Sequence, residues 1–171
     1  RDVAPSRGLG DVYKRQKLGD AGAIWIILAV ILLLIPKTRK TGAIVVAALA
    51  VDIVLCNGIL KPFIGRIRPC DINTSIQLLV ARPDDFSFPS GHTAASFAAV
   101  AALYFAGEKM LWKPALILSC FIAFSRLYLY VHYPTDILGG IVVGILAGYL
   151  GYQMVVKLKV IIDNRNVRKE R

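Results

Sequence analysis

His132 is one of only two histidines in the chain, and it lies in a short polar stretch between two long apolar runs. Arg126 precedes it by six residues and Asp136 follows it by four. A histidine can attack phosphorus when one ring nitrogen is free and a carboxylate holds the other. Asp136 is suited to hold the ring, although it could also be an ordinary acid at a helix start. The spacing therefore makes His132 a candidate nucleophile with Asp136 as its orienting partner.

His92 belongs to a second polar stretch, Phe86-Ser87-Phe88-Pro89-Ser90-Gly91-His92-Thr93, which runs into an alanine-rich segment. This pattern indicates a helix start, with Ser90 as a possible N-cap. The backbone N–H groups near Ser90 and Gly91 would then favour an anion. A helix cap alone explains the serine and the glycine, but it does not require a histidine. His92 can protonate a leaving group, because histidine titrates near neutral pH.

A third cluster, Lys61-Pro62-Phe63-Ile64-Gly65-Arg66-Ile67-Arg68-Pro69, places three cations within eight residues. Such side chains at a membrane surface can simply extend toward the headgroups. Arginine, however, binds phosphate through two hydrogen bonds, and several fixed cations suit the oxygens of a phosphoryl group. No Asp/Glu cluster with divalent-metal spacing is evident in the sequence. We therefore expect a metal-independent reaction that uses no cofactor.

Five apolar runs must position these clusters. They comprise residues 21–36, 42–60, 93–107, 114–131 and 137–156, and each is nearly free of charge. A bilayer core of about 30 Å needs about 20 apolar helical residues. The second, fourth and fifth runs are long enough, and the other two are shorter but plausible. Because 56% of the residues are hydrophobic, a soluble helical protein is the weaker alternative. We predict an all-α fold, a polytopic transmembrane bundle with five spans.

The placement of charge predicts how the bundle is oriented. If the runs alternate in direction, the links after the first and third runs share one side with the C-terminal tail, and all three segments are basic. The positive-inside rule makes that side cytoplasmic. The three polar clusters then lie together on the extracytoplasmic face, where the rule would leave few cations. The net charge of +10 therefore requires no nucleic acid partner.

Residues 1–16 differ in composition from the rest of the chain and do not begin with methionine. They resemble translated adapter sequence and contain no apolar signal-peptide region. We expect a non-native segment at 1–16, a transmembrane domain at 17–157 and a basic cytoplasmic tail at 158–171. We also expect that the native N-terminus, with a sixth span, is missing.

Three features lie inside the predicted spans. Asp52 in the second span costs about 2.5–3.5 kcal/mol in a bilayer, so it must face other helices or be protonated. We favour a structural hydrogen bond to a neighbouring helix over a proton relay. Trp25, near the outer end of the first span, is expected in an interfacial aromatic belt. The glycines at positions 140, 144, 148 and 151 favour close packing within the bundle over dimerisation.

Lys61-x6-Arg68-Pro69, Pro89-Ser90-Gly91-His92 and Ser125-Arg126-x5-His132-x3-Asp136 resemble the three ordered motifs of the type 2 phosphatidic acid phosphatase family. The core of this family is related to that of vanadium-dependent haloperoxidases. The resemblance covers roughly residues 17–157. It implies phosphate binding by five residues: Lys61, Arg68, Ser90, Gly91 and Arg126. It also implies that His132 is the nucleophile, that His92 is the general acid and that Asp136 is the partner of His132. Members of the family commonly have six spans.

The sequence therefore predicts a phosphatase of a bacterial-type inner membrane, acting on a lipid phosphate through a phosphohistidine. The resemblance to small bacterial members suggests undecaprenyl diphosphate, phosphatidylglycerol phosphate or phosphatidic acid. We prefer undecaprenyl diphosphate, because an outward-facing site suits the recycling of a carrier lipid. One alternative is a transporter or binding protein that holds anionic headgroups without cleaving them. Another is haloperoxidase chemistry, which would need bound vanadate. The sequence does not indicate the oligomeric state.

Overall fold

The computed structural model describes residues 21–169, so the expectations for residues 1–16 lie outside the described residues. Every element in the described part is a helix, which confirms the predicted all-α fold there. The main helices are α2 (Ala21–Leu34), α3 (Arg39–Asp52), α6 (Gly91–Ala106), α7 (Trp112–Tyr128) and α8 (Pro134–Lys169). A π-helix, η1 (Ile53–Leu60), and the short α4 (Lys61–Ile64) continue α3, while α5 (Pro69–Ile72) lies in the long link to α6.

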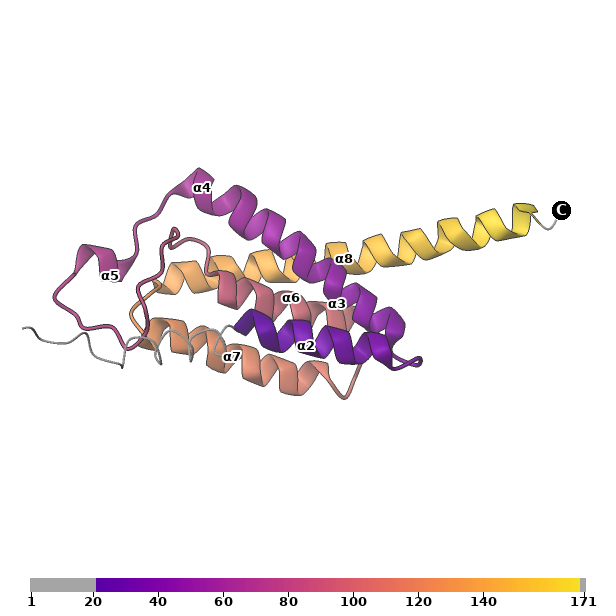
Figure 1. Ribbon diagram of the computed structural model, residues 1–171, viewed down its shortest axis with the longest axis horizontal. Coiled ribbons are helices and arrows are strands. Elements are labelled where there is room, and N and C mark those ends of the chain that lie inside the picture. The colour runs from indigo at the N-terminus through magenta and orange to yellow at the C-terminus, as the bar shows by residue number, and fades with distance from the viewer. Residues whose placement is uncertain (1–20, 170–171) are drawn as a thin grey trace, which may run out of the picture.

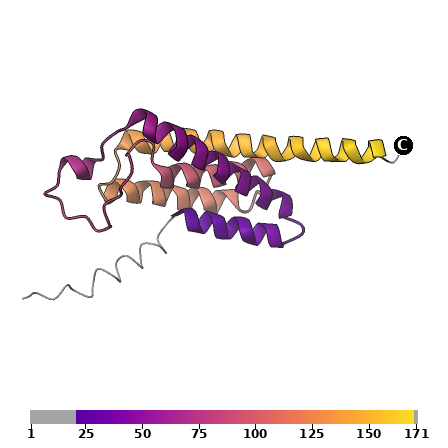
Figure 2. The same ribbon diagram turned by 45° about the horizontal axis from the view of Figure 1, so that its top comes forward.

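Helix α6 is the centre of the bundle, because it packs against α2, α3, α7 and α8. Figures 1 and 2 show these helices running side by side, with the C-terminal part of α8 extending beyond the bundle. The inward positions of α6 are small, and its buried residues include Ala94, Ala98, Ala99, Ala101 and Ala102. Small residues allow neighbouring helix backbones to come close.

The glycines of α8 make the closest of these contacts. A Cβ atom on Gly144 would lie 2.4 Å from the carbonyl oxygen of Ala94, and one on Gly148 would lie 2.5 Å from the Ala101 side chain. Gly151 is equally close to Ala48 of α3. The predicted use of these glycines for packing within the bundle is therefore confirmed.

The core between α2, α3 and α6 contains Trp25, which is only 1% exposed. Its indole Nε1 donates a 2.9 Å hydrogen bond to Ser96 Oγ of α6. The prediction that Trp25 belongs to an interfacial aromatic belt was wrong. The indole N–H finds its polar partner on a neighbouring helix, so it does not need the membrane–water interface.

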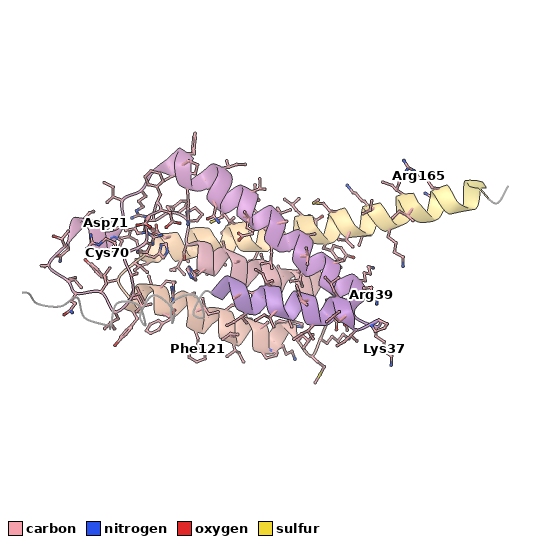
Figure 3. All side chains as sticks on the ribbon, viewed as in Figure 1. Lys37, Arg39, Cys70, Asp71, Phe121 and Arg165 are labelled. Carbon is pink, nitrogen blue, oxygen red and sulfur yellow. The ribbon has the colours of Figure 1, made fainter. Side chains whose placement is uncertain are left out.

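The two ends of the bundle differ in character. The α2–α3 link, the α6–α7 link and the C-terminus of α8 lie at one end, and the long 65–90 segment and the α7–α8 link lie at the other (Figure 1). Figure 3 shows Lys37, Arg39 and Arg165 toward the first end, with Cys70 and Asp71 at the second. The helix directions therefore alternate as predicted. Helix α8 runs through the predicted boundary at 157 without a break.

Two segments are apolar and long enough to cross a membrane by length and composition, Arg39–Ile72 and Pro134–Ile162. Gly22–Leu34 and Gly91–Ala106 are apolar but shorter. Large apolar side chains cover the outward helix faces: Ile26, Phe121 and Leu138 are 58%, 69% and 63% exposed. Phe121 points away from the bundle (Figure 3). Five spans remain a prediction, of which two have the required length in the structure.

Candidate active site

The three polar clusters meet at one end of the bundle. The 65–90 segment folds across that end, next to the link between α7 and α8 (Figure 1). The backbone N–H of Ser87 donates to the carbonyl of Arg66 at 2.8 Å, and the N–H of Ser90 donates to that of Asp136 at 3.0 Å. These two bonds join residues from all three clusters, so the clusters form the walls of one site.

His132 lies in the turn before α8, and its ring has a partner on each nitrogen. Oδ2 of Asp136, in the first turn of α8, is 3.4 Å from His132 Nδ1. Arg68 Nη1 is 3.1 Å from Nε2. Because a guanidinium can only donate, Nε2 must accept, and we assign the ring proton to Nδ1, facing Asp136. This tautomer leaves Nε2 without a proton, as a nucleophilic histidine requires. The Nε2 lone pair faces Arg68, so the guanidinium must turn away from it before the ring can attack.

The surroundings of His132 favour its neutral form. Burial lowers the pKa of His132, and the positive charges of Arg68 and Lys61 lower it further. The hydrogen bond and the charge of Asp136 act in the opposite direction, but the net result is a lowered pKa. At neutral pH the ring is therefore uncharged and Nε2 carries no proton.

Asp136 is completely buried, and both of its carboxylate oxygens accept hydrogen bonds. Ser87 Oγ donates to Oδ2 at 2.5 Å, and the backbone N–H of Tyr133 donates to the same oxygen at 2.8 Å. Arg66 Nη1 donates to Oδ1 at 2.9 Å, while its guanidinium lies 4.0 Å above the Tyr133 ring. These donors fix the carboxylate that orients His132. Ser87 and Arg66 belong to the polar clusters of the sequence, but no site role was predicted for them.

Lys61 reaches the site because of the π-helix η1. Asp52 and Lys61 are nine residues apart, which is two and a half turns of an α-helix, so a regular helix would place them on opposite faces. The wider i→i+5 winding of η1 instead brings both inward, where they are 3% and 7% exposed. The apolar run of 42–60 predicts only a regular helix here.

Asp85 forms ion pairs with two of the predicted phosphate ligands. Its Oδ2 pairs with Lys61 Nζ, and its Oδ1 lies 2.5 Å from Arg68 Nη2. Burial by itself would raise the pKa of Asp85, but the hydrogen bonds and charges of the two cations outweigh it and lower the pKa overall. Asp85 is therefore ionised at neutral pH. Sequence reasoning missed this residue, because nothing in its position in a long loop shows that it turns inward.

Ser90, Gly91 and His92 begin α6, as the sequence predicts. Ser90 occupies the N-cap position, but its side chain makes no capping hydrogen bond. Its buried Oγ instead accepts a 3.0 Å hydrogen bond from Thr93 Oγ1. A Cβ atom on Gly91 would lie 3.4 Å from Lys61 Nζ, so glycine allows the start of α6 to approach this cation closely.

A cavity of about 1200 Å³ joins these groups. Six predicted site residues line it: Lys61, Arg68, Gly91, His92, Arg126 and His132. Ser90 and Asp136 are not among its lining residues. Apolar side chains of α2, α3 and η1, including Ile26, Leu49 and Ile53, form much of the remaining wall. Within residues 21–169, no group of three or more His, Cys, Asp or Glu residues could hold a metal ion. Because cations line one part of the cavity and apolar side chains line another, the cavity can accept a molecule with an anionic group at one end and an apolar body.

Asp52 also lines this cavity and is buried, as expected for an acid that faces other helices. Its Oδ1 has no hydrogen-bond partner among the residues that the structure describes. The favoured structural hydrogen bond is thus not observed at that oxygen. The proton relay through Asp52, which is the less favoured alternative, is not tested by this geometry.

Comparisons with known proteins give a consistent result. The model described as "PAP2 superfamily" matches residues 25–159. An undecaprenyl-diphosphatase of Sulfolobus acidocaldarius is 30% identical over 131 residues, which are 77% of this chain and 63% of that protein. The chain thus spans less than two thirds of the length of this relative. The crystal structure of Aquifex aeolicus LpxE has a similar fold, with a TM-score of 0.68, 24% identity and coverage of 88% of each chain. A transmembrane PAP2-type phosphatidylglycerolphosphate phosphatase from Bacillus subtilis has a TM-score of 0.64 and 28% identity, and the match covers 90% of this chain and 80% of that one.

Proposed function

Because the chain belongs to the PAP2 superfamily, we propose that it is a metal-independent phosphatase, which hydrolyses the phosphate or diphosphate of a membrane lipid through a phosphohistidine on His132. The main support is the orientation of the His132 ring, whose Nε2 faces Arg68 while Nδ1 faces Asp136. A protein that only holds anionic headgroups needs the cations but gains nothing from an oriented, neutral imidazole. This geometry therefore favours catalysis over the transporter or binding alternative.

In the first step, Arg68 Nη1 turns from His132 Nε2 to a phosphoryl oxygen, Nε2 attacks phosphorus, and the bond between phosphorus and the leaving oxygen breaks. His92 donates a proton to that oxygen as it leaves. Lys61, Arg68 and Arg126 neutralise the non-bridging oxygens, which carry the charge in the transition state. The phosphorylated ring is cationic, and the carboxylate of Asp136 stabilises it through the proton on Nδ1.

In the second step, His92 accepts a proton from a water molecule whose oxygen attacks phosphorus. The phosphorus–nitrogen bond breaks, inorganic phosphate leaves, and Nε2 regains its lone pair. His92 thus loses a proton in the first step and regains one in the second, so it acts first as an acid and then as a base. Every proton and electron pair is accounted for without a metal ion.

We place the protein in a membrane, with the active site at the membrane surface. The exposed apolar side chains on the outward faces of the helices support this, because water would not favour so large an apolar surface. The basic residues at the end opposite the site support a cytoplasmic C-terminus and an extracytoplasmic site in a bacterial-type inner membrane. The lipid tail would leave the cavity between α2 and η1, which contribute apolar lining residues.

We prefer undecaprenyl diphosphate as the substrate, with phosphatidylglycerol phosphate and phosphatidic acid as alternatives. The similarity to an undecaprenyl-diphosphatase and to a phosphatidylglycerolphosphate phosphatase supports the first two. A cavity of about 1200 Å³ is large enough for either headgroup together with the first part of its tail.

The test is phosphate release from these three purified lipids by the detergent-solubilised protein in EDTA. We expect turnover of at least one of them, and its loss in His132→Ala. Ser119→Ala is a control that should keep the activity. It removes a buried serine hydroxyl from the middle of α7, away from the end of the bundle that carries the site. Undiminished turnover by His132→Ala would exclude the assigned nucleophile, and complete dependence on a divalent metal would exclude the metal-independent reaction.

A further inference from the structure

The cations that must bind the phosphoryl group already hold an anion from the chain itself. Lys61 and Arg68 each pair with a different oxygen of the Asp85 carboxylate. A phosphoryl group offers the same arrangement, two negatively charged oxygens on one central atom. Asp85 therefore occupies the site of two phosphate oxygens, and both cannot contact the two cations at once.

We propose that Asp85 is an intramolecular competitor for the phosphate site, which sets the affinity that an anion must have to enter it. Asp85 also lines the cavity with Lys61, Arg68 and His132, so its carboxylate stands in the path of the incoming group. The inference rests on the proposed function only in taking Lys61 and Arg68 as ligands of the substrate phosphate.

The exposure of the three side chains favours this exchange. Their side chains alone are 9% exposed for Lys61 and 4% exposed for Arg68, and a buried cation without a counterion is costly. The Asp85 side chain is 51% exposed, so it can rotate into water while the two cations stay in place. Asp85 thus neutralises the two cations and leaves them when a better anion arrives.

The backbone around Asp85 is fixed, so the exchange needs only a side-chain rotation. Arg68 Nε donates to the carbonyl oxygen of Asp85 at 2.8 Å, and Ser87 N donates to that of Arg66 at 2.8 Å. These bonds hold the loop against the Lys61–Pro69 cluster whichever way the carboxylate points. The tethered carboxylate therefore remains next to the site and can return when the product leaves.

The consequence is a threshold for anion binding. A competitor in the chain lowers the apparent affinity of every anion by the fraction of time that the site is open. A dianionic phosphate gains from both cations and from His92, Arg126 and the N–H groups of α6, so it still binds. The phosphodiester headgroups of a bilayer carry one negative charge and are abundant, and this threshold keeps them from filling the site. The same competition speeds the release of inorganic phosphate.

The test compares inhibition by inorganic phosphate and by vanadate in wild type, Asp85→Asn and Asp84→Asn, with binding of vanadate to the purified protein as a second readout. Asp84 is the exposed neighbour of Asp85 and serves as the matched control. If the site is open about one tenth of the time, Asp85→Asn binds both anions about tenfold more tightly, and Asp84→Asn is unchanged. Phosphatidylglycerol in mixed micelles should inhibit the Asp85→Asn variant more strongly than it inhibits the wild type.

Equal or weaker anion binding in a folded Asp85→Asn protein would overturn the proposal. Asp85→Ser, which also removes the charge, provides the same comparison if the asparagine variant does not fold. The outcome separates two ideas. Tighter vanadate binding without turnover of any lipid supports the role of Asp85 and counts against the phosphatase, whereas turnover with unchanged anion binding supports the phosphatase and counts against this role.

Discussion

Ser87→Ala tests whether the support of Asp136 matters for catalysis. Ser87 is fully buried, and its Oγ donates to Asp136 Oδ2 and lies 3.5 Å from His132 Nδ1. Removing it takes one of the three donors, other than His132 itself, from the carboxylate that orients the proposed nucleophile. Arg66 and the backbone N–H of Tyr133 remain.

The size of the effect follows from these contacts. A hydrogen bond to a charged group contributes about 1.5–3 kcal/mol, and about 1.4 kcal/mol corresponds to a tenfold change in rate. Because two donors still hold Asp136, we expect the lower end of this range, a fall in kcat of about tenfold with little change in KM. In the proposed mechanism the substrate contacts the cations rather than Ser87, which is why KM should stay constant.

The pH profile distinguishes this positioning role from a general loss of structure. Without the hydroxyl of Ser87, the Asp136 carboxylate interacts more strongly with His132 and raises the pKa of that ring. Since the proposed attack requires neutral His132, the acid limb of kcat/KM should move to higher pH. The assay is phosphate release between pH 4 and 9, with Ser119→Ala as the buried-serine control. An unchanged kcat and an unchanged acid limb in folded Ser87→Ala would refute the reasoning.

Two further predictions concern the wild-type profile and the bundle. The acid limb of kcat/KM in the wild type should have its midpoint below 6.5, because burial and the nearby cations lower the pKa of His132 from that value, and a midpoint above 6.5 would contradict the described environment. Gly144→Ala should destabilise the protein by about 1–3 kcal/mol in thermal unfolding, since the new Cβ would lie 2.4 Å from the Ala94 carbonyl oxygen. Gly58→Ala, where the nearest atom is 3.9 Å away, is its control and should be neutral or slightly stabilising, and equal stability of the two variants would count against the packing argument.

The features that could be predicted from the sequence are those that local spacing determines. Apolar runs set the helices, and their alternation places the three polar clusters at one end. The interval of four residues between His132 and Asp136 places the two side chains one turn apart at the start of α8. Proline, glycine and small residues mark the start of α6 at Ser90 and Gly91.

The features that could not be predicted depend on how distant segments meet. Ser87 and Asp85 lie in a long loop, and only its return across the end of the bundle shows that they reach Asp136 and the cations. Their residue types are common in loops, so no local signal separates them from neighbours such as Asp84. The burial of Trp25 is unpredictable for a similar reason. Its hydrogen-bond partner, Ser96, is on another helix, so the sequence around Trp25 does not show that the indole has a partner inside the bundle.

The position of Lys61 illustrates a third kind of limit. Helical periodicity is a reliable guide only while the winding is regular, and η1 changes the winding between Asp52 and Lys61. The sequence motif selects Lys61 as a candidate, but regular helix geometry would turn it away from Asp52. The structure shows how the two side chains come to share one cavity.

The most direct test of the central claim is to trap the covalent intermediate. Enzyme mixed with a lipid substrate labelled in its reacting phosphate is quenched in alkali, which preserves phosphohistidine, and the labelled residue is located by mass spectrometry. Acid-labile label is expected on His132 in the wild type, and none is expected in His132→Ala. Label on His92 or on an acid-stable residue, or turnover that proceeds with no label on His132, would contradict it.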